Sequence, residues 1–140
     1  MIDQRAIEER LARGHNAAIG VRYAAHGENW TELVLAYDIG LSSDWDEGIL
    51  ASGPIITMMD VAASFAVWVR KGDFTNQATL DLRVDYMRPA LPRQAVFGRA
   101  ECYRLTRSIA FVRGIAHQGD VADPVAHVVG TFMFLDGATL

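Results

Sequence analysis

Apolar residues follow two different spacings along this chain, and each spacing predicts a different kind of element. Residues 53–69 are apolar almost without interruption, which indicates a helix that protein surrounds on most sides. Pro54 fits the first turn of this helix, and Ser52 or Gly53 is the expected cap. Its basic last turn is followed by Gly72, a typical helix stop. We therefore expect one long, buried helix.

The remaining segments predict a second layer, made of strands. Residues 3–13 form a short amphipathic helix that pads this layer, and residues 40–51 form a loop that leads into the long helix. Most of the later connections are short, so neighbouring strands are expected to run antiparallel. The order of elements predicts an α+β domain in which one antiparallel sheet wraps around one helix. Strands are expected at residues 21–25, 30–37, 77–87, 95–106, 108–117 and 125–135.

The strand at residues 77–87 alternates between apolar and polar side chains, which predicts one packed face and one exposed face. A sheet with one packed face is suited to a single covering helix. The packed face is expected to carry Leu80, Leu82, Val84 and Tyr86, and the exposed face Thr79, Asp81, Arg83 and Asp85.

Length and composition fit one domain over residues 1–140, with the short helix at residues 3–13 and a core at residues 14–135. The charged amino end and the absence of an uninterrupted membrane-length apolar stretch predict a cytoplasmic protein without membrane attachment. A net charge of -4 argues against nucleic acid as a partner. The single cysteine, Cys102, excludes an internal disulfide and a cysteine-rich metal site.

Asp60 is the one acidic residue inside the long apolar run. An ionised carboxylate in such a place is costly unless hydrogen bonds, a cleft or a partner subunit receive it. Thr57 and Ser64, three and four residues away, share its stripe of the helix surface. This polar stripe fits either a structural acid satisfied by its neighbours or the lining of a narrow cleft, and the residues alone leave both interpretations open.

Three segments, together with the order of elements, carry a resemblance to a known family. They are ILASGPIITMMDVA at residues 49–62, TLDLRVDYMRPA at residues 79–90 and GTFMFL at residues 130–135. They resemble hotdog-fold acyl-CoA thioesterases of the PaaI-like type, in the 4-hydroxybenzoyl-CoA thioesterase superfamily, over roughly residues 14–135. The resemblance implies a hotdog fold and hydrolysis of a thioester to a carboxylic acid and coenzyme A. No cofactor is implied beyond the coenzyme A that the substrate carries.

The resemblance also implies roles for particular residues. Asp60 matches the family's general base or nucleophile, and Thr79 matches a hydroxyl that helps to hold the attacking water. The backbone N–H of Ser52 or Gly53 would polarise the thioester carbonyl, so that one rigid helix could supply both functions. Active sites of the family lie at the interface of a homodimer, often paired again as a dimer of dimers, so a partner subunit would complete the cleft around Asp60.

Two positions depart from the family pattern. The family usually reads His-Gly-Gly where this chain has Ala51-Ser52-Gly53, and it usually has an asparagine where Trp45 stands. Two side-chain helpers of the reaction are therefore missing, and the loss of one oxyanion donor typically costs about a hundredfold in rate. Trp45 indicates a modified, bulkier acyl pocket.

Further substrate contacts are expected outside the catalytic group. Thr57 and Ser64 would line the cleft beside Asp60. Arginine is well suited to phosphate oxygens, and relatives often carry a basic residue and a hydroxyl at the turn that here contains residues 105–108. For each arginine, a position on the solvated surface without a binding role is an equally good interpretation. The candidates for binding the phosphates of coenzyme A are Arg88, Arg104, Arg107 and Ser108.

Alternative functions differ in what they require of the sequence. A metal site at His117 and His127 is not expected, because no close-spaced pair of ligands accompanies them. A hotdog dehydratase pairs a histidine in the approach loop with an acid on the helix, and residues 41–51 contain no histidine. A non-catalytic protein that binds acyl-CoA or another apolar ligand remains open, because Ala51 and Trp45 replace catalytic helpers. The acyl group and the choice between dimer and tetramer are also open.

Overall fold

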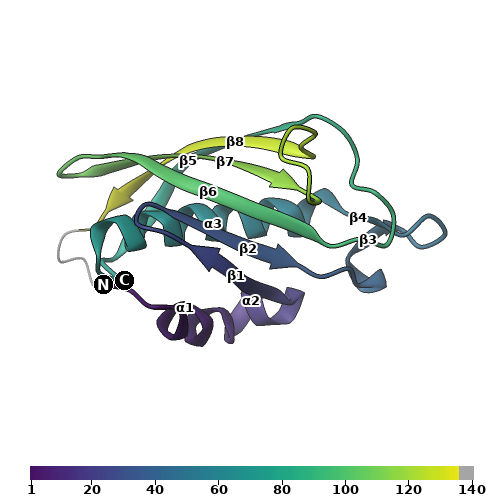
Figure 1. Cartoon of the computed structure of the whole chain (residues 1–140), viewed down its shortest axis with the longest axis horizontal. Coiled ribbons are helices and arrows are strands. Elements are labelled where there is room, and N and C mark those ends of the chain that lie inside the picture. Colours follow the sequence, from purple (N-terminus) through teal and green to yellow (C-terminus); the bar gives the residue numbers. More distant parts are fainter. Residues whose placement is uncertain (136–140) are drawn as a thin grey trace.

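A computed structural model of the chain describes residues 1–135, without the side chain of Asp44; residues 136–140 of the predicted domain lie outside the described part. A six-stranded antiparallel sheet wraps around the long helix α3 (Ser52–Lys71), as Figure 1 shows. The predicted α+β hotdog arrangement is confirmed. The sheet strands are β1 (Val21–His26), β2 (Trp30–Leu35), β5 (Gln77–Tyr86), β6 (Val96–Leu105), β7 (Ile109–His117) and β8 (Ala126–Phe134).

The spatial order of the strands is β1-β2-β6-β7-β8-β5, and every neighbouring pair is antiparallel. β5 follows α3 directly in the sequence, yet it lies at one edge of the sheet, next to β8. Two short helices, α1 (Gln4–Leu11) and α2 (Gly14–Ile19), lie beside the opposite edge strand β1 (Figure 1). One edge of the sheet is therefore accompanied by helices, whereas no strand of residues 1–135 pairs with the outer side of β5 at the other edge.

Local chemistry explains most differences from the predicted elements. The cap of α3 is Ala51, with no side-chain hydrogen bond, and not Ser52 or Gly53, which are the first two helical residues. Gly72 ends the helix in the left-handed conformation, as predicted. The predicted loop at residues 40–51 holds a single 3-10 turn and a small hairpin of β3 (Ser42–Asp44) and β4 (Ile49–Leu50).

The core lies between α3 and the inner face of the sheet. Ile55, Met59, Ala62 and Ala66 of α3 are almost completely buried, and the helix packs across β2, β6 and β7. Within residues 1–135, α3 is the one helix with the length and composition to cross a membrane. Its buried side chains pack against the sheet, so in this fold it is the core helix of the domain.

A bulge in β5 changes which residues face the helix. The pairing with β8 shifts between Thr79 and Asp81, so Leu80 is the extra residue and is 52% exposed. Thr79 pairs with Phe132 and Leu82 with Gly130, and these positions share the inner face. The predicted alternation was therefore wrong at two positions: Thr79 points toward α3, and Leu80 does not.

Gly130 permits the close approach of β5 at this bulge. A Cβ atom at residue 130 would lie 2.6 Å from the backbone oxygen of Asp81, which cannot move without shifting the strand. We expect Gly130→Ala to lower the free energy of unfolding by about 1–3 kcal/mol, the usual effect of overpacking. Chemical denaturation measures the change.

The matched control for this substitution is Gly98→Ala on the same sheet face. A Cβ atom at residue 98 would meet the flexible side-chain ends of Met58 and Met59, at 3.0 and 2.8 Å. Because these ends can move, the control should lose clearly less stability than Gly130→Ala. Equal losses for the two variants would contradict the importance of the close backbone approach at the bulge.

Candidate active site

The carboxylate of Asp60 meets a hydroxyl group from the sheet. Asp60 is half-buried on α3, and the Thr79 hydroxyl on β5 donates a hydrogen bond to its Oδ1 at 2.8 Å. One helical turn further along α3, the side-chain amide of Gln77 donates to Ser64, at 2.7 Å to Oγ and 2.9 Å to the carbonyl oxygen. Two polar pairs therefore connect α3 to β5.

The spacing of these pairs follows from the two kinds of element. Asp60 and Ser64 are four residues apart on a helix, a rise of about 6 Å. Thr79 and Gln77 are two residues apart on a strand, a rise of about 6.6 Å, and share one face. Because the two rises nearly match, each helix residue meets one strand residue. A helix and an edge strand that run side by side thus hold the carboxylate in a fixed position.

A cavity of about 500 Å³ opens beside these pairs. The cavity is lined by Asp60, Ser64, Gln77 and Thr79, and its apolar walls are Val61, Phe65, Trp68, Phe74 and Phe132. Among residues 1–135, Thr79 supplies the one hydrogen bond to the Asp60 carboxylate, which leaves acceptor capacity on the oxygens. Of the two interpretations of the polar stripe, this geometry favours the cleft lining over the sealed structural acid.

The amino end of α3 is exposed and lacks a side-chain cap. Ser52 and Gly53 are exposed, and in the described part of the chain no acceptor receives their backbone N–H groups. The Tyr86 hydroxyl donates to the carbonyl oxygen of Ser52 at 3.0 Å, which orients the first peptide group of the helix. Burial raises the pKa of the Tyr86 phenol above its ordinary value. The free N–H groups and the positive end of the helix dipole favour an oxygen with negative charge.

The carboxylate and the helix start lie too far apart to act together within one chain. Ser52 and Asp60 are eight residues apart on α3, a rise of about 12 Å. They also line different cavities, since Ser52 lies beside a second one of about 480 Å³ with Tyr86 and Ile55. The interpretation that one helix supplies both functions to one thioester is therefore wrong. Both functions at one thioester would require two copies of the helix.

The predicted phosphate-binding residues belong to two segments at opposite ends of the sheet, the chain after β5 and the turn between β6 and β7 (Figure 1). The Arg88 guanidinium is occupied: its Nε pairs with Asp123 at 3.2 Å, and its other nitrogens donate to Pro89, Gln118 and Asp123. These contacts tie the end of β5 to the loop before β8, and they do not favour phosphate binding. Trp45, at the tip of the β3–β4 hairpin, is 75% exposed.

Arg104, Arg107 and Ser108 lie at the other end, at the turn between β6 and β7. All three are exposed, and the Phe134 N–H donates to the Ser108 carbonyl oxygen at 2.9 Å. Phe134 pairs with Gln77, so this turn lies at the end of the sheet where Gln77 lines the Asp60 cavity. Thr57 is half-buried on the same stripe of α3 as Asp60.

The histidines form no metal site in the part of the chain that the structure describes. His117 is buried on the outer face of the sheet, where its Nε2 lies 3.1 Å from Glu32 Oε2 and its ring stacks on Phe97. The Gly119 N–H donates to the His117 Nδ1, which places the ring proton on Nε2, facing Glu32. His127 is exposed.

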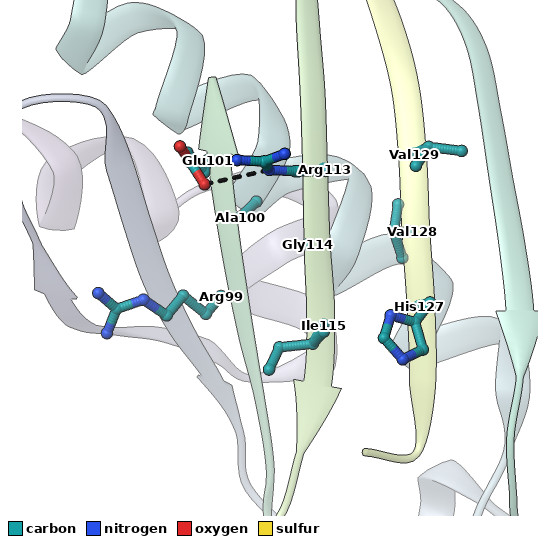
Figure 2. A pocket seen from close by; sticks show the side chains of 9 residues that line it. All are labelled: Arg99, Ala100, Glu101, Arg113, Gly114, Ile115, His127, Val128 and Val129. Carbon is teal, nitrogen blue, oxygen red and sulfur yellow. Dashed lines mark hydrogen bonds and ion pairs between the residues drawn. The ribbon is translucent and has the colours of Figure 1, made fainter. Parts of the chain in front are cut away.

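A hollow of about 340 Å³ on the outer face of the sheet does not belong to this site. The backbone of three adjacent strands forms the floor of this hollow (Figure 2). Glu101 and Arg113, an ion pair at 3.3 Å, lie on one part of its rim. Ile115 and His127 lie across from them. The sheet separates this hollow from α3 and therefore from Asp60.

Gln77, Tyr86 and Arg10 were missed as site residues by the sequence analysis. Gln77 could have been found, because it lies two strand residues from Thr79, just as Ser64 lies one helical turn from Asp60. Tyr86 was assigned to the packed face, but no pattern signals that its hydroxyl reaches the helix start. Arg10 lines the Asp60 cavity from α1, a contact that local sequence cannot reveal.

Comparisons with known proteins agree with this fold. Residues 47–125, more than half of the chain, match a family model described as the thioesterase superfamily. A solved structure from Pseudomonas aeruginosa is 38% identical, with 94% of this chain and 98% of that chain covered and a TM-score of 0.85.

More distant structures share the fold. A thioesterase from Haemophilus influenzae is 17% identical, with 96% of this chain and 92% of that chain covered and a TM-score of 0.84. A thioesterase family protein from Silicibacter pomeroyi is 23% identical, with 94% and 96% covered and a TM-score of 0.81. The search of curated proteins found no match. By the family model and the shared fold, the chain belongs to the thioesterase superfamily of hotdog proteins.

Proposed function

We propose that this protein is an acyl-CoA thioesterase of the PaaI-like type, whose active sites form between two copies of the chain in the cytoplasm. The observation that carries the proposal is the Asp60 carboxylate, held by Thr79 at 2.8 Å on the wall of a cavity of about 500 Å³. A positioned carboxylate with free acceptor capacity is what the activation of a water molecule requires.

The open stripe of α3 supports the pairing of two copies. Ile56 is 37% exposed midway between Ser52 and Asp60, and an apolar side chain there is suited to a protein partner. A two-fold axis that passes near Ile56 would set two α3 helices antiparallel. The helix start of one copy would then face Asp60 of the other, which removes the separation of about 12 Å.

The edge strand β5 provides the backbone for this pairing. Its ten residues lie at an open edge of the sheet, and the exposed strand edge is a template for another strand. Two β5 strands paired antiparallel would join the sheets of a homodimer. A homotetramer would follow from pairing two such dimers.

The reaction adds water across the thioester. Asp60 of one copy takes a proton from a water molecule held with Thr79, or attacks the carbonyl carbon itself and is then released by water. The helix-start N–H of the other copy stabilises the negative charge that develops on the carbonyl oxygen. The carbon–sulfur bond breaks, the sulfur leaves as coenzyme A thiolate and takes up a proton, and the carboxylic acid remains.

The other proposed contacts complete the substrate site. Arg104, Arg107 and Ser108 are our candidates for the phosphates of coenzyme A; both guanidiniums are exposed and lack an ion pair in residues 1–135. Ala51, Trp45, Thr57 and Ser64 would shape the acyl side. With an alanine in place of the family's histidine, the backbone N–H groups carry the oxyanion stabilisation.

Subunit complementation tests this proposal. Asp60→Asn and Ser52→Pro each disable one half of a site, and each homodimer should keep about 1% of the activity or less. The two variant chains are co-expressed with different tags, and the mixed dimer is purified through both tags. At one of its two sites, the intact Asp60 of one chain meets the intact helix start of the other. We expect it to regain up to about half of the wild-type activity, consistent with two independent sites. A mixed dimer as inactive as its parents would contradict a site shared between copies.

Thiol release from a panel of acyl-CoA esters measures the activity. Cys102 is the single cysteine of the chain, it is buried, and burial raises the pKa of its thiol, so a thiol reagent at neutral pH reports coenzyme A. Wild-type protein that binds coenzyme A esters but releases no thiol from any of them would favour the alternative, a non-catalytic acyl-CoA-binding protein.

A further inference from the structure

We propose that the acyl group accepted by this enzyme ends in a carboxylate, and that Arg10 binds it. This inference rests on the proposed function, because it names the substrate class of that site. A thioester of a short dicarboxylic acid, such as a glutaryl or adipyl thioester, would be the preferred substrate. The argument follows from the far wall of the cavity that begins at Asp60.

The cavity continues along α3 from Asp60 past Ser64 to Trp68. Aromatic rings form part of the wall, but polar side chains accompany them along its length, among them Asn16, Ser64 and Gln77. The side-chain oxygen of Gln77 is buried and has no hydrogen-bond partner within residues 1–135. A long apolar acyl chain would exclude water from this oxygen and from Asn16, which is costly. The lining therefore favours a short acyl group with polar atoms of its own.

Among residues 1–135, Arg10 is the one cation that lines this cavity, and Asp60 is the one anion. The guanidinium of Arg10 lies over the Phe74 ring, 3.6 Å from its centroid, and 5.9 Å from the centroid of Trp68. Stacking uses the flat face of a guanidinium and leaves the N–H donors at its edge free to bind a carboxylate in a bidentate manner. The rings thus hold the cation in place without consuming its hydrogen bonds.

The acids nearest to Arg10 in sequence are already engaged. The Glu9 carboxylate pairs with Arg5 at 3.0 Å, and Glu8 accepts a hydrogen bond from Gln4 at 2.7 Å. Within residues 1–135, no carboxylate forms an ion pair with Arg10. In the described part of the chain, the cavity therefore presents a positioned cation without a carboxylate partner.

The separation of the two charges sets the length of the acyl group. Trp68, the ring beside Arg10, lies eight residues along α3 from Asp60, a rise of about 12 Å. A thioester carbonyl beside Asp60 would direct the far end of a glutaryl or adipyl group toward the guanidinium. At that distance the negative charge of Asp60 repels the substrate carboxylate only weakly through the intervening solvent.

Matched substrates and a charge-removing variant test the inference. Wild-type enzyme should hydrolyse glutaryl-CoA with a kcat/KM at least about tenfold higher than pentanoyl-CoA, which has the same chain length without the carboxylate. Arg10→Gln should lower kcat/KM for glutaryl-CoA by about ten- to a hundredfold, the size of a lost charge-assisted hydrogen bond, and leave pentanoyl-CoA nearly unchanged. Arg13→Gln is the control, because Arg13 neighbours Arg10 in a surface hollow but does not line this cavity. Equal losses for both substrates would overturn the inference.

The phosphates of coenzyme A are the other source of an anion for Arg10. Glutaryl and pentanoyl thioesters of N-acetylcysteamine carry no phosphate and distinguish the two. A selective loss on the glutaryl thioester in Arg10→Gln supports the inference. A loss on both coenzyme A substrates and on neither N-acetylcysteamine substrate would assign Arg10 to the phosphates and overturn it.

Calorimetric titration separates a failure of this inference from a failure of the proposed catalysis. Asp60→Asn protein should bind glutaryl-CoA about tenfold or more tightly than pentanoyl-CoA, and Arg10→Gln added to Asp60→Asn should remove this preference. The preference would support the carboxylate site even if the wild-type enzyme hydrolysed neither ester. Equal affinities would contradict the carboxylate site whether or not thioesters are hydrolysed.

Discussion

Asp60→Asn should lower kcat/KM for acyl-CoA hydrolysis by about a thousandfold, within the range that a positioned general base contributes. Asparagine has nearly the same shape, and its side-chain oxygen still accepts the hydrogen bond that Thr79 donates at 2.8 Å. The substitution therefore removes the negative charge and leaves the contact with β5 intact. Steady-state thiol release measures the loss, and thermal unfolding checks that the variant is folded.

Asp81→Asn is the matched control for this prediction. Asp81 lies on the same strand, β5, but beyond the bulge and on the exposed side, so the substitution removes an equal charge away from the cavity. The control should retain nearly full activity. If Asp60→Asn kept activity comparable to that of Asp81→Asn, the carboxylate of Asp60 would have no part in the reaction and the proposed mechanism would have to be abandoned.

The pattern of apolar and polar residues predicts much of the fold, because it reflects which side chains are buried. The apolar run at residues 53–69 becomes the core helix, and Gly72 ends it, since both depend on local residues. The antiparallel strands follow from the short connections between them. The edge position of β5 does not follow, because the pairing of β5 with β8 joins segments about fifty residues apart and no local signal selects that neighbour.

The candidate site is predictable in part. Asp60 can be singled out from the sequence because a carboxylate in an apolar run demands an explanation. The direction of Thr79 cannot be predicted, because one extra residue in the strand, Leu80, reverses the alternation. The bulge depends on Gly130 across the strand pair, so the pattern within β5 alone gives no indication of it.

The proposed division of the site between two copies rests on helix geometry. A helix rises about 1.5 Å per residue, so the eight residues from Ser52 to Asp60 fix their separation in any fold. The sequence alone thus contained the observation that one helix cannot serve one thioester with both groups. The exposed Ile56 between them is where we propose that the second copy packs.

Ser52→Pro should lower kcat by about a hundredfold, because it removes the backbone N–H that we assign to the developing oxyanion. The fold should tolerate the substitution. Ser52 is the first residue of α3, the helical position that best accepts proline. Ala51 has φ −65° and ψ 155°, the conformation that a residue before proline prefers, and in residues 1–135 the Ser52 N–H has no acceptor to lose. Single-turnover kinetics would show the loss in the chemical step.

Ser52→Ala is the control, since it keeps the N–H and removes the side-chain hydroxyl. It should retain activity close to the wild-type level, and both variants should unfold at nearly the wild-type temperature. A Ser52→Pro enzyme with full activity would contradict the assignment to Ser52 and transfer the role to the N–H of Gly53. The Gly53 N–H and the Ser52 carbonyl belong to the same peptide group. The Tyr86 hydroxyl holds this group by donating to the Ser52 carbonyl oxygen at 3.0 Å. Tyr86→Phe would then be the variant with the larger loss of kcat, because it releases the orientation of that peptide group.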